Sequence, residues 1–393
     1  MNSSSLTWEG RTEPSASAAR VAVSALFFVN GFAFASWVPH IPTVQARMGL
    51  SAGQLGLALL GVAAGSLVSM PIAGAQVARW GSRAVSLVSS LLLCPLVVLP
   101  VHAPSLPWLA VTLVAFGAVT GAMGVAMNAH AVAVERRLGR TVMSSFHGLF
   151  SLGGLVGSGG SILALSYGLT PSHHMVLAGA LGFLTVVAVS RSLLPGSADE
   201  GGAAQPFALP KGPLLLLGGL AFFVLVVEGA MADWSAVYLR QSLRAEAGLA
   251  GAGYAVFSLA MSLGRLTGDR LVTVVGPERL VRVGGALAAG GLGGALLLHH
   301  PVAALVGFTC VGLGLSNLIP VLFSAASRTP GSSPGVSIAS VSTAGYGGFL
   351  VGPPVVGFLA DQLGLPGALG LLVAFLAIVA AGGALVRPSQ RND

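Results

Sequence analysis

Long uncharged apolar runs alternate with short polar segments along almost the whole chain. A helix needs about 20 mainly apolar residues to cross the ~30 Å hydrocarbon core of a membrane. Three of the runs are long enough for two spans each, and each of these breaks at a Pro or His turn. The pattern therefore predicts twelve membrane-spanning helices. The runs cover residues 21–46, 48–78, 84–134, 141–190, 212–227, 247–264, 283–327, 329–360 and 362–386, with the three turns at 102–107, 167–174 and 299–301.

The polar segments predict how these helices are grouped. The longest, RSLLPGSADEGGAAQPFALPKGP at residues 191–213, is rich in Gly, Pro and Ala and is typical of a linker. The first apolar run follows a long polar stretch in which two Arg are offset by two Glu, so we interpret it as a retained helix and not as a signal peptide. We expect an N-terminal tail over 1–19, a six-helix bundle over 20–193, a linker over 194–211, a second six-helix bundle over 212–386 and a C-terminal tail over 387–393.

Composition and charge support an all-α membrane protein. Only 8% of residues are charged, whereas about a quarter are charged in a typical soluble domain. If the N-terminus is cytoplasmic, twelve spans place sixteen of the 19 Lys and Arg residues inside, as the positive-inside rule requires. The net charge of +7 therefore reflects orientation and not nucleic-acid binding. We expect a multi-pass protein of the bacterial inner membrane, embedded in the lipid bilayer with both termini cytoplasmic.

The two predicted bundles resemble each other in sequence. Asn30-Gly31 in the first span matches Glu228-Gly229 in the seventh, 198 residues later. Gly153 matches Gly352 at an offset of 199, and Gly81 matches Gly276 at an offset of 195. A near-constant offset at three places indicates a duplicated six-helix unit, which is typical of secondary transporters.

Several stretches resemble the major facilitator superfamily, in particular its bacterial fucose-permease-like members: FVNGFAFASWVPHIP, MNAHAVAVERRLGR, SSFHGLFSLGGLVG, EGAMADWSAVYL, MSLGRLTGDR and GLSNLIPVLFSAASR. The resemblance covers essentially the full length. It implies two pseudo-symmetric six-helix bundles, a cavity lined mainly by spans one, four, seven and ten, and a monomer that works by alternating access.

One signature of the superfamily is incomplete here. The loop between spans two and three usually carries Asp followed by Arg, but this chain has Ala78 before Arg79, and the equivalent position of the second half is Thr273. Other charged residues near these loops are candidates for a substitute cytoplasmic gate network. The candidates are Arg79, Arg83, Glu135, Arg136, Asp269 and Arg270.

Two carboxylates lie within the apolar seventh span. With a rise of 1.5 Å per residue, Glu228 lies about 22 Å into the span and Asp233 about 30 Å. A charge in mid-bilayer costs at least ~2.5–3.5 kcal/mol, so Glu228 is expected to face a cavity and to move protons, because a carboxyl group is neutral when dry and ionised when wet. Its alternative is a neutral acid that bonds to a neighbouring helix. Asp233 is either an interfacial acid beside Trp234 and Tyr238 or a second proton carrier, and His147 is a third candidate.

Other polar and aromatic residues lie at depth on spans that the resemblance places around the cavity. Amide, imidazole and phenol groups hydrogen-bond hydroxyls, amides or carbonyls of a solute. Each of them could instead bond between helices, and Trp37 fits the outer interface slightly better than a binding site. The candidates for solute binding are Asn30, Trp37, Asn128, His130, Asn317 and Tyr346, of which Tyr346 aligns with His147 in the repeat.

Other chemistry is not legible in the sequence. It has no phosphate-binding loop, no catalytic triad and no metal-ligand set, because the pairs at 173–174 and 299–300 are neighbouring His residues that do not converge on one ion. We therefore expect no cofactor, no metal and no enzymatic activity. The expected function is proton-coupled transport of a small polar or amphipathic solute, with uptake of a sugar-like solute slightly favoured. Export of a drug or metabolite is an alternative, and a non-transporting membrane sensor or assembly partner is another.

Overall fold

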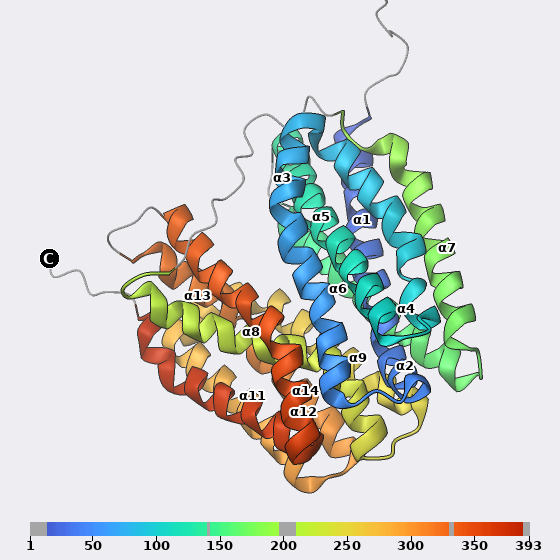
Figure 1. The fold of residues 1–393 in the computed structure, drawn as a ribbon. Coiled ribbons are helices and arrows are strands. Elements are labelled where there is room, and N and C mark those ends of the chain that lie inside the picture. The colour runs from blue at the N-terminus through green and yellow to red at the C-terminus, as the bar shows by residue number, and fades with distance from the viewer. Residues whose placement is uncertain (1–13, 140–141, 196–209, 330–333, 388–393) are drawn as a thin grey trace, which may run out of the picture.

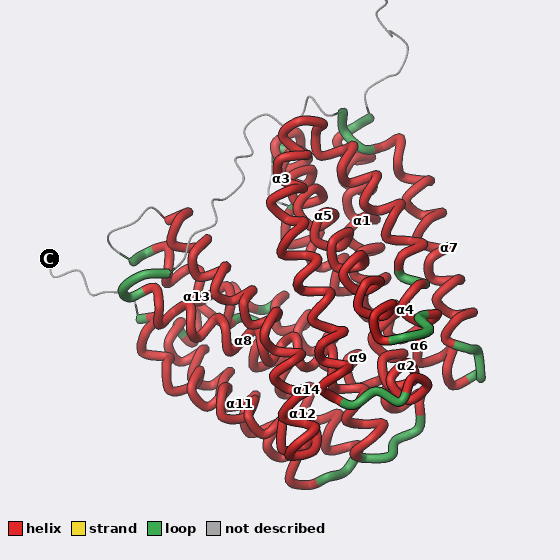
Figure 2. Tube along the Cα trace, in the orientation of Figure 1, coloured by secondary structure: helices red, strands yellow, loops and turns green. Residues whose placement is uncertain are grey.

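The computed structural model describes residues 14–139, 142–195, 210–329 and 334–387, and the side chains of Ser144, Asp269, Pro334 and Gly335 are not described. The described part is helical and contains no strand (Figure 2). The predicted tails and linker lie largely outside it. The first half comprises α1 (Ala16–Trp37), η1 (Val38–His40), α2 (Ile41–Met48), α3 (Ala52–Leu96), α4 (Leu99–His102), α5 (Leu106–Leu138), α6 (Met143–Ser166), α7 (Pro171–Val189) and η2 (Ser190–Ser192). The second comprises α8 (Leu214–Val237), η4 (Tyr238–Ser242), α9 (Ala247–Leu266), α10 (Gly268–Val275), α11 (Pro277–Leu298), α12 (Pro301–Leu315), α13 (Leu318–Ser327), α14 (Pro334–Ala381) and η5 (Gly382–Val386).

Ten helical segments of the described part are long and apolar enough to cross a membrane. Two of them have 51 residues, Ala52–His102 and Val336–Val386, which as continuous helix would be about 76 Å long and more than twice the membrane thickness. Each is interrupted by a glycine with non-helical dihedral angles, Gly81 in one and Gly364 in the other. The expected twelve spans match the ten segments when these two are each counted as two crossings.

The backbone repeats the same bends in both halves. Gly81 has φ 81° and ψ 154°, and its predicted counterpart Gly276 has φ 82° and ψ 153°. Gly168 and Gly364, 196 residues apart, also share a positive φ, 75° and 73°. A side chain would strain these conformations, so glycine is the residue that such bends require. The duplication inferred from the sequence is therefore present in the turns between the helices.

Within each half, glycines let helix backbones come into direct contact. A Cβ atom added at Gly117 of α5 would lie 2.0 Å from the carbonyl oxygen of Val62 in α3. In the second half, a Cβ atom at Gly312 of α12 would lie 2.4 Å from the carbonyl oxygen of Phe257 in α9. Gly117 and Gly312 are 195 residues apart, and so are their contact partners Val62 and Phe257, so the two contacts are equivalent in the repeat. Close packing of small residues replaces the hydrophobic driving force between helices in a membrane.

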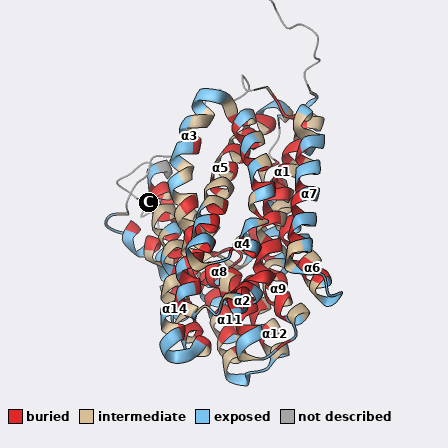
Figure 3. Cartoon of the chain, turned by 45° about the vertical axis from the view of Figure 1, so that its right-hand side comes forward, coloured by how far each residue is buried: buried red, intermediate tan, exposed pale blue. Residues whose placement is uncertain are grey.

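The two halves meet at one end and diverge at the other (Figure 1). The end at which α7 finishes and α8 begins is called the linker end here, and the opposite end, where α1 leads into α2, is called the α2 end. Helix ribbons of the two halves are far apart only at the linker end. Figure 3 shows buried positions along the facing sides of the helices and exposed positions along the outward sides.

Contacts between the halves gather at the α2 end. The Asp361 carboxylate of α14 accepts hydrogen bonds from the Ser51 hydroxyl and the Gly53 backbone N–H at the start of α3, both 2.9 Å long. Gln241 donates to the Gln45 side chain over 2.8 Å. The polar groups that join the halves thus lie at the end where the ribbons converge.

The backbone contacts predict unequal effects of alanine along α5. Gly117→Ala is expected to lower the thermal midpoint of the purified protein, because overpacking costs about 1–3 kcal/mol and a backbone carbonyl cannot move aside cheaply. Gly124 lies in the same helix with nothing within 4 Å of its added Cβ. Gly124→Ala is therefore expected to leave the midpoint unchanged or raise it, because alanine is the better helix former. Equal midpoints for the two variants would contradict the packing described for Gly117.

Candidate functional site

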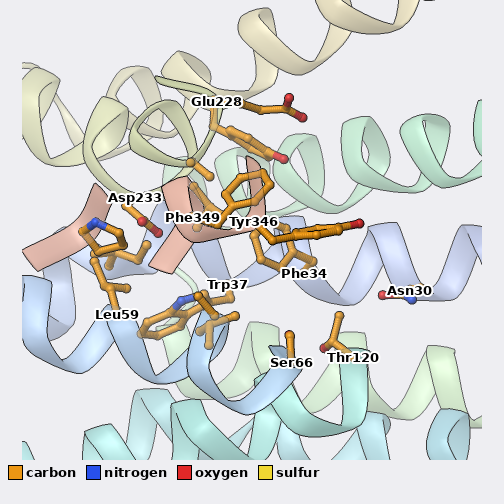
Figure 4. Close-up of a pocket in the computed structure, with 18 of the residues that line it drawn as sticks. Asn30, Phe34, Trp37, Leu59, Ser66, Thr120, Glu228, Asp233, Tyr346 and Phe349 are labelled. Atoms are coloured by element: carbon orange, nitrogen blue, oxygen red, sulfur yellow. The ribbon is translucent and has the colours of Figure 1, made fainter. Parts of the chain in front are cut away.

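A cavity of about 350 Å³ lies between the two halves. Side chains of α1, α3, α5 and α6 line it from the first half, and side chains of α8, α9 and α14 line it from the second (Figure 4). Its volume lies at the lower end of the range for small-molecule sites. Aromatic and aliphatic groups form most of the wall. Its polar groups are Asn30, Ser66, Thr120, Glu228, Asp233, Tyr254 and Tyr346.

The repeat places equivalent residues on opposite walls. Asn30 and Glu228, which the sequence analysis paired, both line the cavity. So do three further pairs that follow the same offsets: Leu59 with Tyr254, Val62 with Phe257, and Phe150 with Phe349. The cavity therefore lies on the pseudo-symmetry axis between the halves, which is where secondary transporters bind their solutes.

Glu228 faces the cavity and has a partner, as its depth in the span predicts. Its Oε1 atom accepts a hydrogen bond from Arg265 Nη2 of α9 over 3.3 Å. The Glu228 side chain is 22% exposed and that of Arg265 is 43% exposed, so this ion pair is accessible to water entering between the halves. Tyr254 and Tyr346 lie within electrostatic reach of the same carboxylate.

Asp233 also lines the cavity, which corrects its interpretation as an interfacial acid. It was expected near the membrane surface beside Trp234 and Tyr238 as interfacial residues. Both aromatic side chains are instead fully buried among helices. The reason is that α8 is packed between α9, α13 and α14, so these positions face protein and not the interface.

Asn30 is a buried cavity residue with an unused acceptor. It is 2% exposed, and its Nδ2 donates to the Met127 sulfur over 3.7 Å, while its Oδ1 has no partner among the described residues. Trp37 lines the cavity as well and is 2% exposed, so the preference for an outer-interface position was wrong. Tyr346 is 43% exposed and reaches the cavity from α14.

Three other candidates for solute binding lie outside the cavity lining. His130 is buried, with Nδ1 2.7 Å from the Ser82 hydroxyl and Nε2 accepting from the Leu194 N–H over 3.1 Å. Asn317 donates to the Gly264 carbonyl over 3.0 Å and thereby ties α13 to α9. Asn128 donates to a carbonyl of its own helix over 2.8 Å. For these three, the alternative of a structural hydrogen bond fits the geometry better.

His147 is not part of the cavity lining either. Its ring packs edge-on against Phe27 with centroids 5.2 Å apart, and the side chain is exposed. Arg265 of the other half lies within electrostatic reach of it. The electrostatic link of this candidate is therefore with Arg265, the partner of Glu228.

The gate candidates of the first half make contacts within that half. The Arg79 guanidinium lies 5.6 Å from the Trp80 ring centroid, and Arg83 donates to the Ser190 carbonyl over 3.3 Å. Glu135 accepts from the backbone N–H groups at the start of α6, the Met143 bond being 2.8 Å long. Arg136 and Arg270 are exposed, and the Asp269 side chain lies outside the described residues. The substitute network predicted for this end stays a prediction.

Three polar cavity residues, Tyr254, Ser66 and Thr120, were not among the candidates from the sequence, and neither was Arg265, the partner of Glu228. Arg265 lies in the MSLGRLTGDR stretch, yet its pairing depends on how α9 turns relative to α8. Tyr254 could have been found from the repeat, because the offset of 195 places it opposite Leu59. Ser66 and Thr120 carry no such signal in a chain with many apolar-span hydroxyls.

Comparison with known proteins identifies the family. The sequence model of the Major Facilitator Superfamily matches residues 23–347. An uncharacterized MFS-type transporter of Yersinia pestis is 40% identical over 365 residues, which are 92% of this chain and 94% of that protein. Membrane protein MosC of Rhizobium meliloti is 35% identical over 373 residues, 94% of this chain and 90% of its own. The chain therefore belongs to the Major Facilitator Superfamily, a family of multi-pass membrane transporters and not of enzymes.

Solved structures share the fold at low sequence identity. A mutant of the nucleoside transporter NupG has a TM-score of 0.76 at 11% identity, covering 94% of this chain and 100% of that chain. A bacterial homolog of the human lysosomal transporter Spinster, in an inward-facing and occupied conformation, has a TM-score of 0.72 at 16% identity, covering 96% and 97%. These likenesses show the fold alone. The narrower resemblance to fucose-permease-like members stays a prediction.

The cavity predicts a contrast in thiol reactivity along α3. In a Cys94→Ala/Cys310→Ala background in nanodiscs, Ser66→Cys is expected to react with a water-soluble maleimide at least about tenfold faster than Val68→Cys. The reason is that thiolate forms in water and not in hydrocarbon. Ser66 lines the cavity, whereas Val68, two residues away, is 64% exposed on the outside of the helix. Comparable labelling rates at the two positions would contradict a hydrated cavity.

Proposed function

We propose that this protein is a secondary active transporter that moves a small polar or amphipathic solute across the bacterial cytoplasmic membrane, coupled to protons. The observation that carries the proposal is the cavity between two repeated halves, with polar side chains from both. Both walls of the cavity belong to one chain, which supports a monomer as the functional unit. The lining of aromatic groups with a few polar ones favours a solute with an apolar body and hydrogen-bonding ends.

The way in which the halves touch supports alternating access. They are held together at the α2 end and their helices diverge at the linker end, so we propose that the cavity opens toward the linker end, which the partial exposure of Glu228 and Arg265 supports. The positive-inside pattern makes the linker end cytoplasmic, and the conformation is then inward-facing. Rocking of the two halves about the cavity would break the α2-end contacts and open the cavity outward.

Proton coupling is assigned to Glu228 with Arg265. An ionised Glu228 pairs with Arg265, and a protonated Glu228 loses that ion pair. Because the two residues lie on α8 and α9 beside the cavity, the protonation state changes the charge that a solute meets. Asp233 and His147, which lie near Tyr254 and Arg265 respectively, are further candidates for carrying the proton.

The direction of transport is proposed to be uptake, with export as the alternative. Assays of the same purified protein in right-side-out and inverted vesicles separate the two. A solute for these assays is first found by ligand-induced stabilisation of the purified protein and then confirmed by counterflow. A protein that moves no solute in proteoliposomes under any imposed gradient would be a sensor or assembly partner instead.

Glu228→Gln is expected to abolish the proton dependence of transport while leaving exchange of unlabelled for labelled solute measurable. Glutamine keeps the shape of the side chain but cannot release a proton. The measurement is solute flux in proteoliposomes with and without an imposed pH gradient. Glu246→Gln, at the exposed start of α9, is the matched control and is expected to behave as wild type. Gradient-driven accumulation by Glu228→Gln would remove this residue from coupling.

Asp361→Ala is expected to shift the protein toward the outward-open state. Removing a cap at a helix N-terminus costs about 0.5–2 kcal/mol, which corresponds to a change of about 2- to 30-fold in the ratio of the two states. Spin-label distances across the α2 end report that ratio. Asp361→Asn keeps an oxygen that accepts from the Gly53 N–H and is expected to shift it less. Identical distance distributions for wild type and Asp361→Ala would show that this contact does not hold the α2 end closed.

A further inference from the structure

The two carboxylates of the cavity are not equivalent. Glu228 has Arg265 as a counter-ion, whereas Asp233 has no ion pair or hydrogen bond with any residue whose side chain is described. No Lys, Arg or His is among the residues that line the cavity. An ionised Asp233 therefore lacks a positive partner there, and an unpaired charge removed from bulk water is costly. A bound cation would supply the missing partner.

The surroundings of Asp233 suit an organic cation better than a metal ion. Tyr254 lies within electrostatic reach of Asp233, and Trp37, Phe257, Leu59 and Pro353 line the same cavity. Figure 4 shows Asp233 at one end of the cavity, with Trp37 and Leu59 beside it. A metal ion would need several oxygen or nitrogen ligands, and the described residues contain no such cluster. An ammonium group is satisfied by one carboxylate together with aromatic faces.

Asn30 provides a second acceptor at the other end. Figure 4 shows it on the far side of the cavity from Asp233. Its Oδ1 is buried and unpartnered, so a solute that donates a hydrogen bond there would satisfy it. Asn30 and Trp37 are seven residues apart on α1, which corresponds to about 10 Å along the helix. The aromatic side chains of Phe34, Tyr346 and Phe349 lie between the two ends.

We propose that the cavity binds an amphipathic organic cation, with its ammonium group on Asp233 and a hydrogen-bond donor at its opposite end on Asn30. This inference rests on the proposed function in one respect only, which is that the cavity is the solute site. It replaces a sugar-like neutral solute by a charged one. A carboxylate-bearing solute would be repelled by an ionised Asp233, and with a neutral solute Asp233 would either take up a proton or lack a counter-ion.

Four small molecules test whether the cavity prefers a positive charge. Each has one benzene ring on a short chain, and they are 2-phenylethylamine, tyramine, 2-phenylethanol and 3-phenylpropanoate. The measurement is the concentration of each probe that gives half-maximal thermal stabilisation of the full-length purified protein at pH 7. The two amines are expected to act at concentrations at least about tenfold lower than the alcohol, as a hydrogen bond to a charged group implies, and the carboxylate is expected not to stabilise.

Variants then test which residue binds each end of the solute. Asp233→Asn is expected to abolish the preference for the amines, while Glu246→Gln retains it. Tyramine is expected to stabilise the wild type at a lower concentration than 2-phenylethylamine, because only tyramine has a hydroxyl at the far end, and Asn30→Leu is expected to remove this difference. The inference is overturned if the alcohol matches the amines, if the carboxylate stabilises best, if Asp233→Asn keeps the preference, or if no probe stabilises the wild type.

Flux measurements separate this inference from the proposed function. Probes that stabilise the protein are tested for counterflow in proteoliposomes. If a neutral solute is transported and amines are not, the cation site is wrong and the transporter proposal stands. If amines bind through Asp233 but no solute crosses the membrane under any gradient, the cation site stands and the transporter proposal falls.

Discussion

The cost of placing charge in hydrocarbon is the constraint on which this structure depends. Glu228 and Asp233 are the two charged residues of a 24-residue helix that is mostly apolar. Neither could stay ionised there against lipid, because a charge in mid-bilayer costs several kcal/mol. The fold meets this constraint by enclosing both residues between two helix bundles and by giving Glu228 a counter-ion from the next helix. A cavity is therefore a consequence of keeping these acids in the membrane.

The second constraint is rigidity within each half. Helices in each bundle approach until backbone touches backbone, as at Gly117 with Val62 and at Gly312 with Phe257. Such contacts have little room to deform, since close-packed interiors transmit strain and do not absorb it. Contacts between the halves are fewer, and their polar members gather at one end, at Asp361 and at the Gln45–Gln241 pair. Relative motion is thus easier between the halves than within them.

The sequence predicts how deep a residue lies in the membrane better than it predicts which side of the helix the residue is on. Run lengths predicted the spans, and the repeat predicted that Gly81 and Gly276 would be equivalent, because both signals are local or periodic. Asn30 and His130 looked alike at that level, since both are polar residues in apolar spans. Which one faces the cavity depends on helix rotation set by packing on every side, and His130 turns instead toward Ser82. Trp37 was misplaced for the same reason.

The duplicated scaffold leaves the lining positions free to differ. Contacts that hold each half together run through glycines and backbone carbonyls, so they do not depend on the side chains that face the cavity. Equivalent positions accordingly carry different chemistry: Asn30 opposite Glu228, and Leu59 opposite Tyr254. Both acids and both tyrosines of the cavity lie in the second half, while the first half contributes Asn30 and Trp37. The second half therefore carries the ionisable side chains of the cavity, and the first half supplies most of its apolar wall together with one amide and the hydroxyls of Ser66 and Thr120.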